Sequence, residues 1–303
     1  MKILITGGTG SLSQELTRQL LQNAEVELIR IFSRNENKQA IMQREFNDPR
    51  MRYLIGDIRD YTRLKRAMRG IDQVYHTAAL KRVEKTHDVD EIEKTNVKGT
   101  ENACNAAEEC GVKKFIFTSS DKAAYPANVY GASKMFGEQK VLQMNAHSTT
   151  RYACTRYGNV LGSNGSILQV WPEQAKTGTI KITDARMTRF WITIKDAASF
   201  VIRCMNGMSG GEIFIPKMKT YGVERLARLI YPEASIEYIG MRDNGEKLHE
   251  TMVIPEERER TKDYGDKYII GGNHFGGIEL EKDFEYSSDI VPSYTDEEMR
   301  GMI

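Results

Sequence analysis

Short apolar runs alternate with segments of helical periodicity through the first half of the chain. In the helical segments apolar side chains recur every three or four residues, as Leu12, Leu16 and Leu20 do. The expected strands are residues 2–6, 28–32, 53–55, 73–77, 114–118 and 152–157. The expected helices are residues 11–23, a segment ending near 46, 62–68, 96–110 and 130–145. This alternation predicts an α/β fold, a doubly wound parallel sheet with helices on both faces.

The pattern changes beyond Gly158. Loops rich in Gly, Ser and Asn precede mixed elements, which include a helix-like run at 195–205 and a short polar helix at 296–303. We therefore expect two regions, residues 1–160 and a smaller one over 161–303, with some chain crossing between them.

Composition and charge narrow the possible partners. The 43 Lys and Arg residues nearly balance the 42 Asp and Glu residues, so the net charge is +1. We expect no nucleic-acid partner, because such a protein usually carries a basic field. Nor does an apolar run approach the roughly 18 residues that a membrane helix needs.

Cysteine and histidine usage bears on the compartment and on metals. The chain begins with a strand-like run rather than a signal segment, and its four cysteines form no C-x-x-C pair. They indicate free thiols in a reducing compartment, so we expect a cytoplasmic protein. The five histidines lie far apart in sequence, and we expect no metal site.

A glycine loop follows the first strand and opens the first helix. Its residues are Gly7, Thr9, Gly10, Ser11 and Leu12, with Ser13 where a third glycine is usual. Backbone without Cβ atoms can approach a pyrophosphate, and the helix N-terminus supplies N–H donors. In this position the loop predicts dinucleotide binding rather than an ordinary turn.

The end of the second strand bears on which dinucleotide binds. A carboxylate usually holds the ribose of NAD there, but this strand ends in Ser33 and Arg34. Hydroxyl and guanidinium groups suit a 2′-phosphate, so we expect NADP rather than NAD. Asp57 follows the third strand, where an acid can bond adenine.

Four chemically capable residues follow the strand at 114–118. Asp121 and Lys122 come directly after it, and Tyr130 and Lys134 lie one helical turn apart. A nearby ammonium lowers the pKa of a phenol, so Lys134 would let Tyr130 act as a base. Ligands of such sheets bind beyond the carboxyl ends of the strands, so we expect these groups to converge.

At this point the chain resembles the extended short-chain dehydrogenase/reductases, and more narrowly the inverting UDP-N-acetylglucosamine 4,6-dehydratases of pseudaminic acid synthesis. The matching stretches cover most of the chain. They include ITGGTGS (5–11), FSRNE (32–36), GDIRD (56–60), AALK (78–81), TNVKGTEN (95–102), SSDKAAYPANVYGASK (119–134), RYGNVLGSNGS (156–166), MTRFWIT (187–193) and GEKLHE (245–250). The resemblance implies a Rossmann domain for NADP at residues 1–160 and a substrate-binding region at 161–303.

The resemblance also implies a mechanism. Tyr130 would take the proton of the sugar 4-hydroxyl while hydride passes from carbon 4 to NADP, and Lys134 would hold the ribose. Lys122 would remove the carbon 5 proton, and Asp121 would assist loss of the 6-hydroxyl. These roles require neutral Lys122 and protonated Asp121. Hydride then returns to carbon 6, and reprotonation of carbon 5 from the opposite face inverts that centre.

Further site residues rest on the same resemblance. Ser120, where the family commonly has Thr, joins the catalytic group. Cofactor contacts extend to Ile58, Ala78, Ala79, Lys81 and Asn96, and the substrate contacts would be Lys81, Asn159, Arg189, Arg242 and Glu246. The loop from Arg242 to Glu246 is one residue longer than in the family and lacks its proline, which bears on substrate choice.

Other functions stay open at this stage. Retaining dehydratases carry Asp-Glu where this chain has Asp121-Lys122, and simple 4-epimerases lack the dehydrating acid. A related enzyme that adds an epimerisation, a retaining dehydratase and a non-catalytic NADP-binding regulator are the alternatives. The resemblance further implies a homo-oligomer built from dimers.

Overall fold

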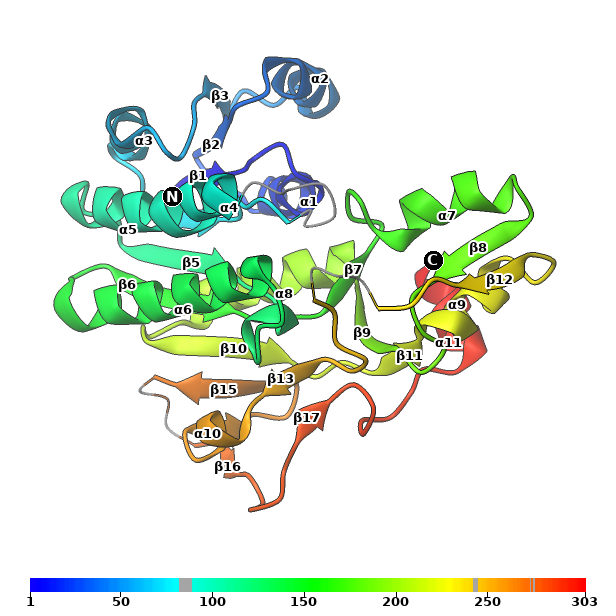
Figure 1. Cartoon of the computed structure of the whole chain (residues 1–303). Coiled ribbons are helices and arrows are strands. Elements are labelled where there is room, and N and C mark those ends of the chain that lie inside the picture. Colours follow the sequence, from blue (N-terminus) through cyan, green and yellow to red (C-terminus); the bar gives the residue numbers. More distant parts are fainter. Residues whose placement is uncertain (82–88, 242–244, 273, 275) are drawn as a thin grey trace.

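A ten-stranded sheet forms the centre of the computed structural model (Figure 1). The structure describes residues 1–81, 89–241, 245–272, 274 and 276–303. The strands lie in the order β16-β14-β15-β10-β6-β5-β4-β1-β2-β3. The chain reverses its winding direction between β1 and β4, which is where ligands bind in open sheets of this kind.

Seven of these strands are parallel, and their interior positions are occupied by apolar side chains. They are β1 (Lys2–Thr6), β2 (Leu28–Ser33), β3 (Met51–Ile55), β4 (Gln73–His76), β5 (Lys114–Thr118), β6 (Arg151–Thr155) and β10 (Glu212–Pro216). Three antiparallel strands complete the sheet: β15 (Lys267–Gly271), β14 (Thr261–Asp263) and β16 (Ile278–Glu279). Strands covered on both faces need apolar side chains on both, which explains the continuous apolar runs.

Helices cover both faces of the sheet (Figure 1). One face carries α3 (Tyr61–Met68), α5 (Gly99–Glu109) and α6 (Val129–His147). The other carries α1 (Ser11–Leu20), α2 (Glu36–Phe46) and α8 (Ile194–Gly207). Three short elements connect these layers: α4 (Val89–Ile92), the π-helix η1 (Glu93–Lys98) and the 3₁₀ turn η2 (Asp121–Ala123).

A smaller assembly with its own apolar core lies beside the carboxyl ends of the parallel strands. Its strands are β7 (Asn159–Leu161), β8 (Thr179–Ile182), β9 (Thr188–Thr193), β11 (Thr220–Gly222) and β12 (Ser235–Tyr238). The antiparallel pair β13 (Thr251–Val253) and β17 (Tyr286–Ser287) packs instead against the core of the main sheet. The helices of the smaller assembly are α7 (Ile167–Ala175), α9 (Val223–Ile230) and α11 (Asp296–Met302), whereas α10 (Pro255–Arg258) contacts β14 of the main sheet. Trp171, Trp191 and Tyr221 are buried at the centre of this second core.

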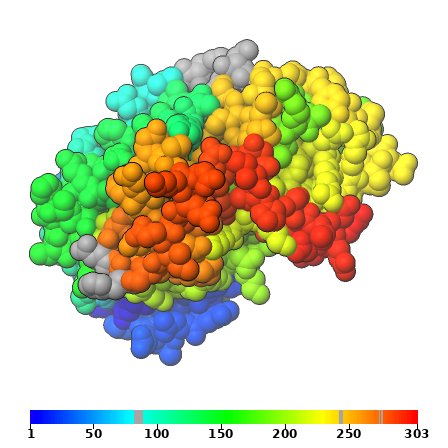
Figure 2. Space-filling model, turned by 90° about the horizontal axis from the view of Figure 1, so that it is seen from below, coloured from blue at the N-terminus to red at the C-terminus, as the bar shows by residue number. Residues whose placement is uncertain are grey.

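The expected doubly wound parallel sheet is confirmed, and most differences are at element ends. The helix expected at 11–23 ends at Leu20, and the strand expected at 152–157 ends at Thr155. Residues of the expected second region, in β10 and β14–β16, extend the sheet of the first. Seen from below, the orange and red C-terminal segments lie across the face of the molecule, between the green and yellow parts (Figure 2).

None of the helices among the described residues combines the length and apolar character that crossing a membrane requires.

Candidate active site

The glycine loop forms a shallow cradle between β1 and α1. Gly7 has φ +62°, and a Cβ atom there would lie 2.7 Å from the Cα of Ala78. The Gly10 amide donates to the Gly7 carbonyl at 2.9 Å, which closes the turn. The Ser13 hydroxyl donates to the Gly7 carbonyl at 3.0 Å, a hydrogen bond that a glycine at this position could not form. The cradle and the helix N-terminus fit a pyrophosphate.

The other expected residues of the loop lie at its edge. Thr9 is buried, and its carbonyl accepts from the side-chain amide of Gln14 at 3.1 Å. Leu12 packs against the main core. The hydroxyl of Ser11 accepts from the Asn164 amide at 3.0 Å, so the loop after β7 reaches over the cradle.

The expected adenosine contacts lie at the ends of β2 and β3. The Arg34 side chain is 52% exposed and lies 3.8 Å from the carboxylate of Asp57. Asp57 also forms an ion pair with Arg59 at 2.7 Å, and these arginines lower its pKa although burial opposes them. The Ser33 hydroxyl accepts from Gln39 at 3.0 Å. Ile58 is buried, so only its main chain is placed to meet a ligand.

Asn96 fixes the segment after β4. Its side-chain oxygen accepts from the Leu80 amide at 2.7 Å, and its amide group donates to Leu80 O and the Ser133 hydroxyl at 2.9 Å each. Ala78 and Ala79 are thereby held beside the glycine loop. Asn96, which lies on η1, therefore joins the segment after β4 to α6.

The segment after β5 is held by β6. Its main-chain amides Ser119 N and Asp121 N donate to Thr155 O and Tyr157 O, at 2.7 and 3.1 Å. Asp121 is fully buried, and its Oδ1 accepts from the Ser120 hydroxyl at 2.7 Å and from Lys122 Nζ at 3.0 Å. The Oδ2 of Asp121 is buried and has no hydrogen-bond partner within the described part of the chain. That atom is available to a ligand.

The N-terminal half of α6 is pressed against this segment. The Asn128 side chain caps the helix by accepting from the Gly131 amide at 2.9 Å. A Cβ atom on Gly131 would overlap the Lys122 carbonyl, so only glycine permits this approach. Lys134, 4% exposed, donates to the Thr118 carbonyl at 2.7 Å. Tyr130 thus lies within electrostatic reach of Asp121 and Lys122, as expected, whereas Lys134 lies against the end of β5.

The protonation states of the ligand-free site differ from those the sequence suggested. Burial raises the pKa of Tyr130 to about 12, although Lys122 and Ser120 oppose the rise. Lys134 is directed at Thr118 instead of lowering that pKa. Burial would lower the pKa of Lys122, but the carboxylates of Asp121 and Glu250 outweigh it and raise the pKa. Neutral Lys122 is therefore not the resting form.

The expected substrate residues fall into different environments. The side-chain oxygen of Asn159 is buried without a hydrogen-bond partner among the described residues, which suits a ligand contact. Arg189 instead donates to main-chain carbonyls of Leu248 and Lys247, each at 2.9 Å. Glu246 accepts from Thr183 at 3.1 Å, and Lys81 reaches the Ser163 hydroxyl at 3.4 Å.

Arg242, also expected to contact the substrate, lies outside the described residues.

One buried carboxylate of the site was missed by the sequence reasoning. Glu250 is 2% exposed and lies 3.3 Å from Lys122 Nζ and 2.8 Å from Lys247 Nζ. It belongs to the stretch GEKLHE, so the resemblance covered it without assigning it a role. An acid directly before an apolar strand was the available signal.

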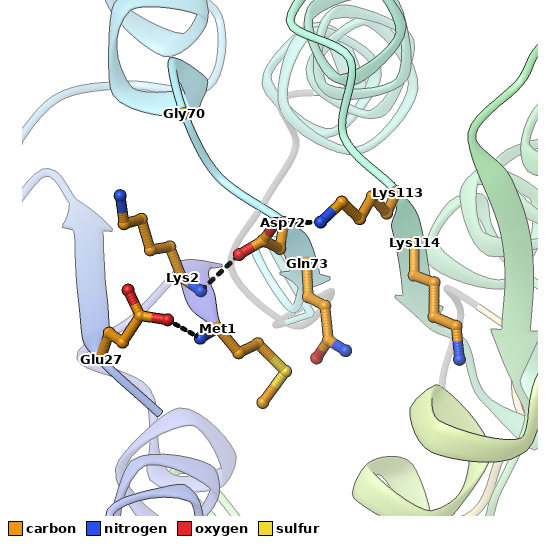
Figure 3. Close-up of a pocket in the computed structure, with 8 residues that line it drawn as sticks. All are labelled: Met1, Lys2, Glu27, Gly70, Asp72, Gln73, Lys113 and Lys114. Atoms are coloured by element: carbon orange, nitrogen blue, oxygen red, sulfur yellow. Dashed lines mark hydrogen bonds and ion pairs between the residues drawn. The ribbon is translucent and has the colours of Figure 1, made fainter. Parts of the chain in front are cut away.

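A hollow of about 580 Å³ lies away from this chemistry, at the amino ends of β1, β4 and β5 (Figure 3). Lys2, Lys113 and Lys114 line it together with Glu27 and Asp72, and the Lys113–Asp72 pair is 2.8 Å long. Parallel strands present ligands at their carboxyl ends, so this hollow is not the active site.

Across the described ranges, no cluster of three or more His, Cys, Asp or Glu side chains is arranged to hold a metal ion.

The doubly wound sheet, the glycine cradle and the Tyr130–Lys134 pair define an extended short-chain dehydrogenase/reductase. The chain belongs to the polysaccharide biosynthesis protein family, whose model matches residues 3–271.

Relatives of the chain include proteins named for two different activities. The chain is 41% identical to the inverting UDP-N-acetylglucosamine 4,6-dehydratase of Campylobacter jejuni, over 97% of this chain and 94% of that protein. It is 37% identical to the UDP-glucose 4-epimerase of Rickettsia bellii, over 88% and 82% of the two chains. The solved structure of Pen from Bacillus thuringiensis superposes with a TM-score of 0.93 at 35% identity, covering 100% of this chain and 96% of the other.

Proposed function

We propose that the protein converts UDP-N-acetylglucosamine to UDP-2-acetamido-2,6-dideoxy-β-L-arabino-4-hexulose, with inversion at carbon 5. One observation carries the proposal: a buried carboxyl and an amine, Asp121 and Lys122, meet at 3.0 Å beyond β5, in the electrostatic reach of Tyr130. An acid and a base of this kind can remove water across carbons 5 and 6 of a 4-keto sugar. The near-full-length likeness to the Campylobacter dehydratase supports the same reaction.

The residues present fit a nicotinamide dinucleotide. The Cβ-free cradle at Gly7 would receive the pyrophosphate, and Lys134 lies where a ribose would approach the end of β5. When bound, the coenzyme accepts hydride from carbon 4 of the sugar and returns it to carbon 6. We propose NADP as its form, because Ser33 and the half-exposed Arg34 occupy the position of a ribose-binding carboxylate.

Tyr130 would take the proton of the 4-hydroxyl. Its phenol is protonated in the ligand-free protein, since its pKa is about 12. Lys122 already lowers that pKa, and a coenzyme bearing positive charge would lower it further. Asn128 and Gly131 hold the start of α6 so that the phenol lies near Ser120 and Asp121.

Elimination would be the work of Asp121 and Lys122. Lys122 would remove the carbon 5 proton, which the 4-ketone has acidified, and the protonated carboxyl of Asp121 would donate to the departing 6-hydroxyl. Delivery of a proton to the other face of carbon 5 inverts that centre. The unpartnered Oδ2 of Asp121 leaves one edge of the carboxyl group without a protein partner among the described residues, which favours contact with the departing hydroxyl.

Epimerisation at carbon 4 is the second candidate, because the Rickettsia bellii relative bears that name. Epimerisation needs only Tyr130, Lys134 and the coenzyme. It gives no role to a fully buried Asp121 joined to Lys122, and this favours dehydration.

Proton NMR of UDP-N-acetylglucosamine with the protein in deuterated water, without added reductant, tests the proposal. We expect a 6-deoxy-4-keto product with deuterium at carbon 5 and L-arabino couplings. A D-xylo product would replace inversion by retention, and a 4-epimer without deoxygenation would make the epimerase assignment correct. Absence of turnover by a coenzyme-loaded protein would favour a different sugar nucleotide first and a regulator second.

We further propose a cytoplasmic homo-oligomer that acts in pseudaminic acid synthesis. Four free cysteines support a reducing compartment. Exposed apolar side chains on α6, Val129, Met135 and Phe136, support self-association. Light scattering during size-exclusion chromatography would measure the oligomeric state. A monomer would contradict the proposed homo-oligomer.

A further inference from the structure

Glu250 is held in the site by hydrogen bonds of its main chain and by an ion pair of its side chain. It directly precedes β13, and its amide donates to the Ser288 hydroxyl at 2.9 Å while its carbonyl accepts from the Ser288 amide at 2.8 Å. Its main chain is therefore fixed on both sides. Its carboxylate, 2% exposed, points at the Lys122 amine.

Three cations surround this one carboxylate. Lys122 Nζ lies 3.3 Å from Oε1, Lys247 Nζ lies 2.8 Å from Oε2, and Arg189 Nε lies 3.9 Å from Oε1. Burial alone would raise the pKa of Glu250, but these cations lower it to about 2. Glu250 therefore keeps its negative charge throughout the working pH range.

The same contacts tie together segments that are distant in sequence. Lys247 donates to the Ala124 carbonyl at 2.9 Å, next to the turn that carries Lys122. Arg189 of β9 fastens the main chain at Lys247 and Leu248. The cluster thus holds the Lys122 amine in one place.

Lys122 lies beside two carboxylates, and Asp121 is the one that can accept its proton. Asp121 Oδ1 is 3.0 Å from Nζ, and transfer of one proton from the ammonium to that carboxylate gives a neutral amine and a protonated acid together. These are the two forms that the proposed elimination needs. The negative charge of Glu250 favours the ammonium form of Lys122 and so opposes this proton transfer. The positive charge of Lys247 offsets part of that effect.

We propose that Glu250 is a positioning residue whose carboxylate, balanced by Lys247, holds the Lys122 amine beside Asp121 and sets how readily that amine releases its proton. This inference rests on the proposed dehydration. Among the described residues, Asp121, Glu250, Arg189 and Tyr130 are charged or titratable groups that face Lys122, and Lys247 acts on it through Glu250.

Two substitutions with opposite expected effects test the inference. The measurement is the pH profile of deuterium incorporation at carbon 5, whose rate rises as Lys122 becomes neutral. In Glu250→Gln the ammonium loses an anion, so the rising limb moves by about 1 pH unit to lower pH. In Lys247→Gln the Glu250 carboxylate loses the positive charge that balances it and stabilises the Lys122 ammonium more strongly. The rising limb therefore moves to higher pH. Glu256→Gln, an exposed acid on α10, is the matched control and leaves the limb in place.

A second measurement is independent of turnover. Reductive methylation with ¹³C-formaldehyde labels the lysines, and the Lys122 signal is the one absent in Lys122→Met. We expect its NMR titration midpoint to fall in Glu250→Gln and to rise in Lys247→Gln. This readout also serves if Glu250→Gln folds poorly, because Lys247→Gln alone gives a signed result.

The outcomes separate the two proposals. If the titration moves as expected but UDP-N-acetylglucosamine is not converted, the proposed function fails and the role of Glu250 stands. If turnover occurs while both variants leave the limb and the midpoint unchanged, or shift them in one direction, Glu250 has only a structural role and the inference is overturned.

Discussion

Lys134 Nζ donates a hydrogen bond to the main-chain oxygen of Thr118 at 2.7 Å, across the junction of α6 and β5. The amine also lies 4.5 Å from the centre of the Phe117 ring. A residue to which we assign a coenzyme contact thus also fastens its helix to a central strand. Burial lowers the pKa of this amine to about 8, although Glu138 opposes the change.

The buried amine of Lys134 makes stability depend on pH. Between pH 8 and about 10.5 the unfolded chain holds a proton on Lys134 that the folded chain lacks, so stability rises with pH across this window. We expect wild type to gain about 2 kcal/mol relative to Lys134→Met between pH 8 and pH 10. Urea unfolding of the ligand-free proteins at both pH values measures it. Parallel pH curves for the two proteins would contradict the expected burial cost.

Asp121→Asn separates elimination from the earlier steps. The amide cannot donate the proton that the departing hydroxyl needs, so we expect 6-deoxy product to form at least about 100-fold more slowly. Oxidation at carbon 4 depends on Tyr130 and should persist. Reduced coenzyme is followed by its absorbance, and product by NMR. Equal loss of both signals would indicate a collapsed site instead of a missing acid.

Arg34→Ala tests the coenzyme preference. A charged hydrogen bond to a 2′-phosphate contributes about 1.5–3 kcal/mol, so NADP binding should weaken roughly 10- to 100-fold while NAD binding is unchanged. Titration calorimetry gives both dissociation constants. Arg44→Ala, on the exposed side of α2, is the control expected to bind NADP normally. Equal weakening for NAD and NADP would rule out a 2′-phosphate contact.

A buried ion-pair network joins α6 to α10. Arg156, 2% exposed, pairs with Glu138 at 2.6 Å and with Glu257 at 2.7 Å. Arg156→Met would leave two buried carboxylates unpaired, and we expect a loss of about 3–5 kcal/mol in the free energy of unfolding.

The comparison variant for this network is Arg225→Met, which breaks a half-exposed pair with Asp296 and should cost about 1 kcal/mol or less. Thermal and urea unfolding compare the two proteins. Similar small losses in both would mean that the buried carboxylates become protonated or hydrated without penalty.

The sequence by itself determined the sheet, the glycine loop and the pairing of Tyr130 with Lys134. These follow from periodicity and from spacing along one element, which are local properties of the chain. The family likeness carried by stretches such as SSDKAAYPANVYGASK added Asp121 and Lys122 to the predicted site residues. Both residues lie in that stretch, directly after the end of a predicted strand.

Only the tertiary structure decided the charges and partners within the site. Glu250 reaches Lys122 from a segment more than 60 residues away, and Lys247 and Arg189 pair with Glu250 there, so no local pattern marks that meeting. The pKa of Tyr130 rises instead of falling because burial outweighs nearby cations, and burial is a property of the packed molecule. Arg189 donates to the main-chain carbonyls of Leu248 and Lys247, which lie far along the chain, so its partners could not be predicted from the local sequence.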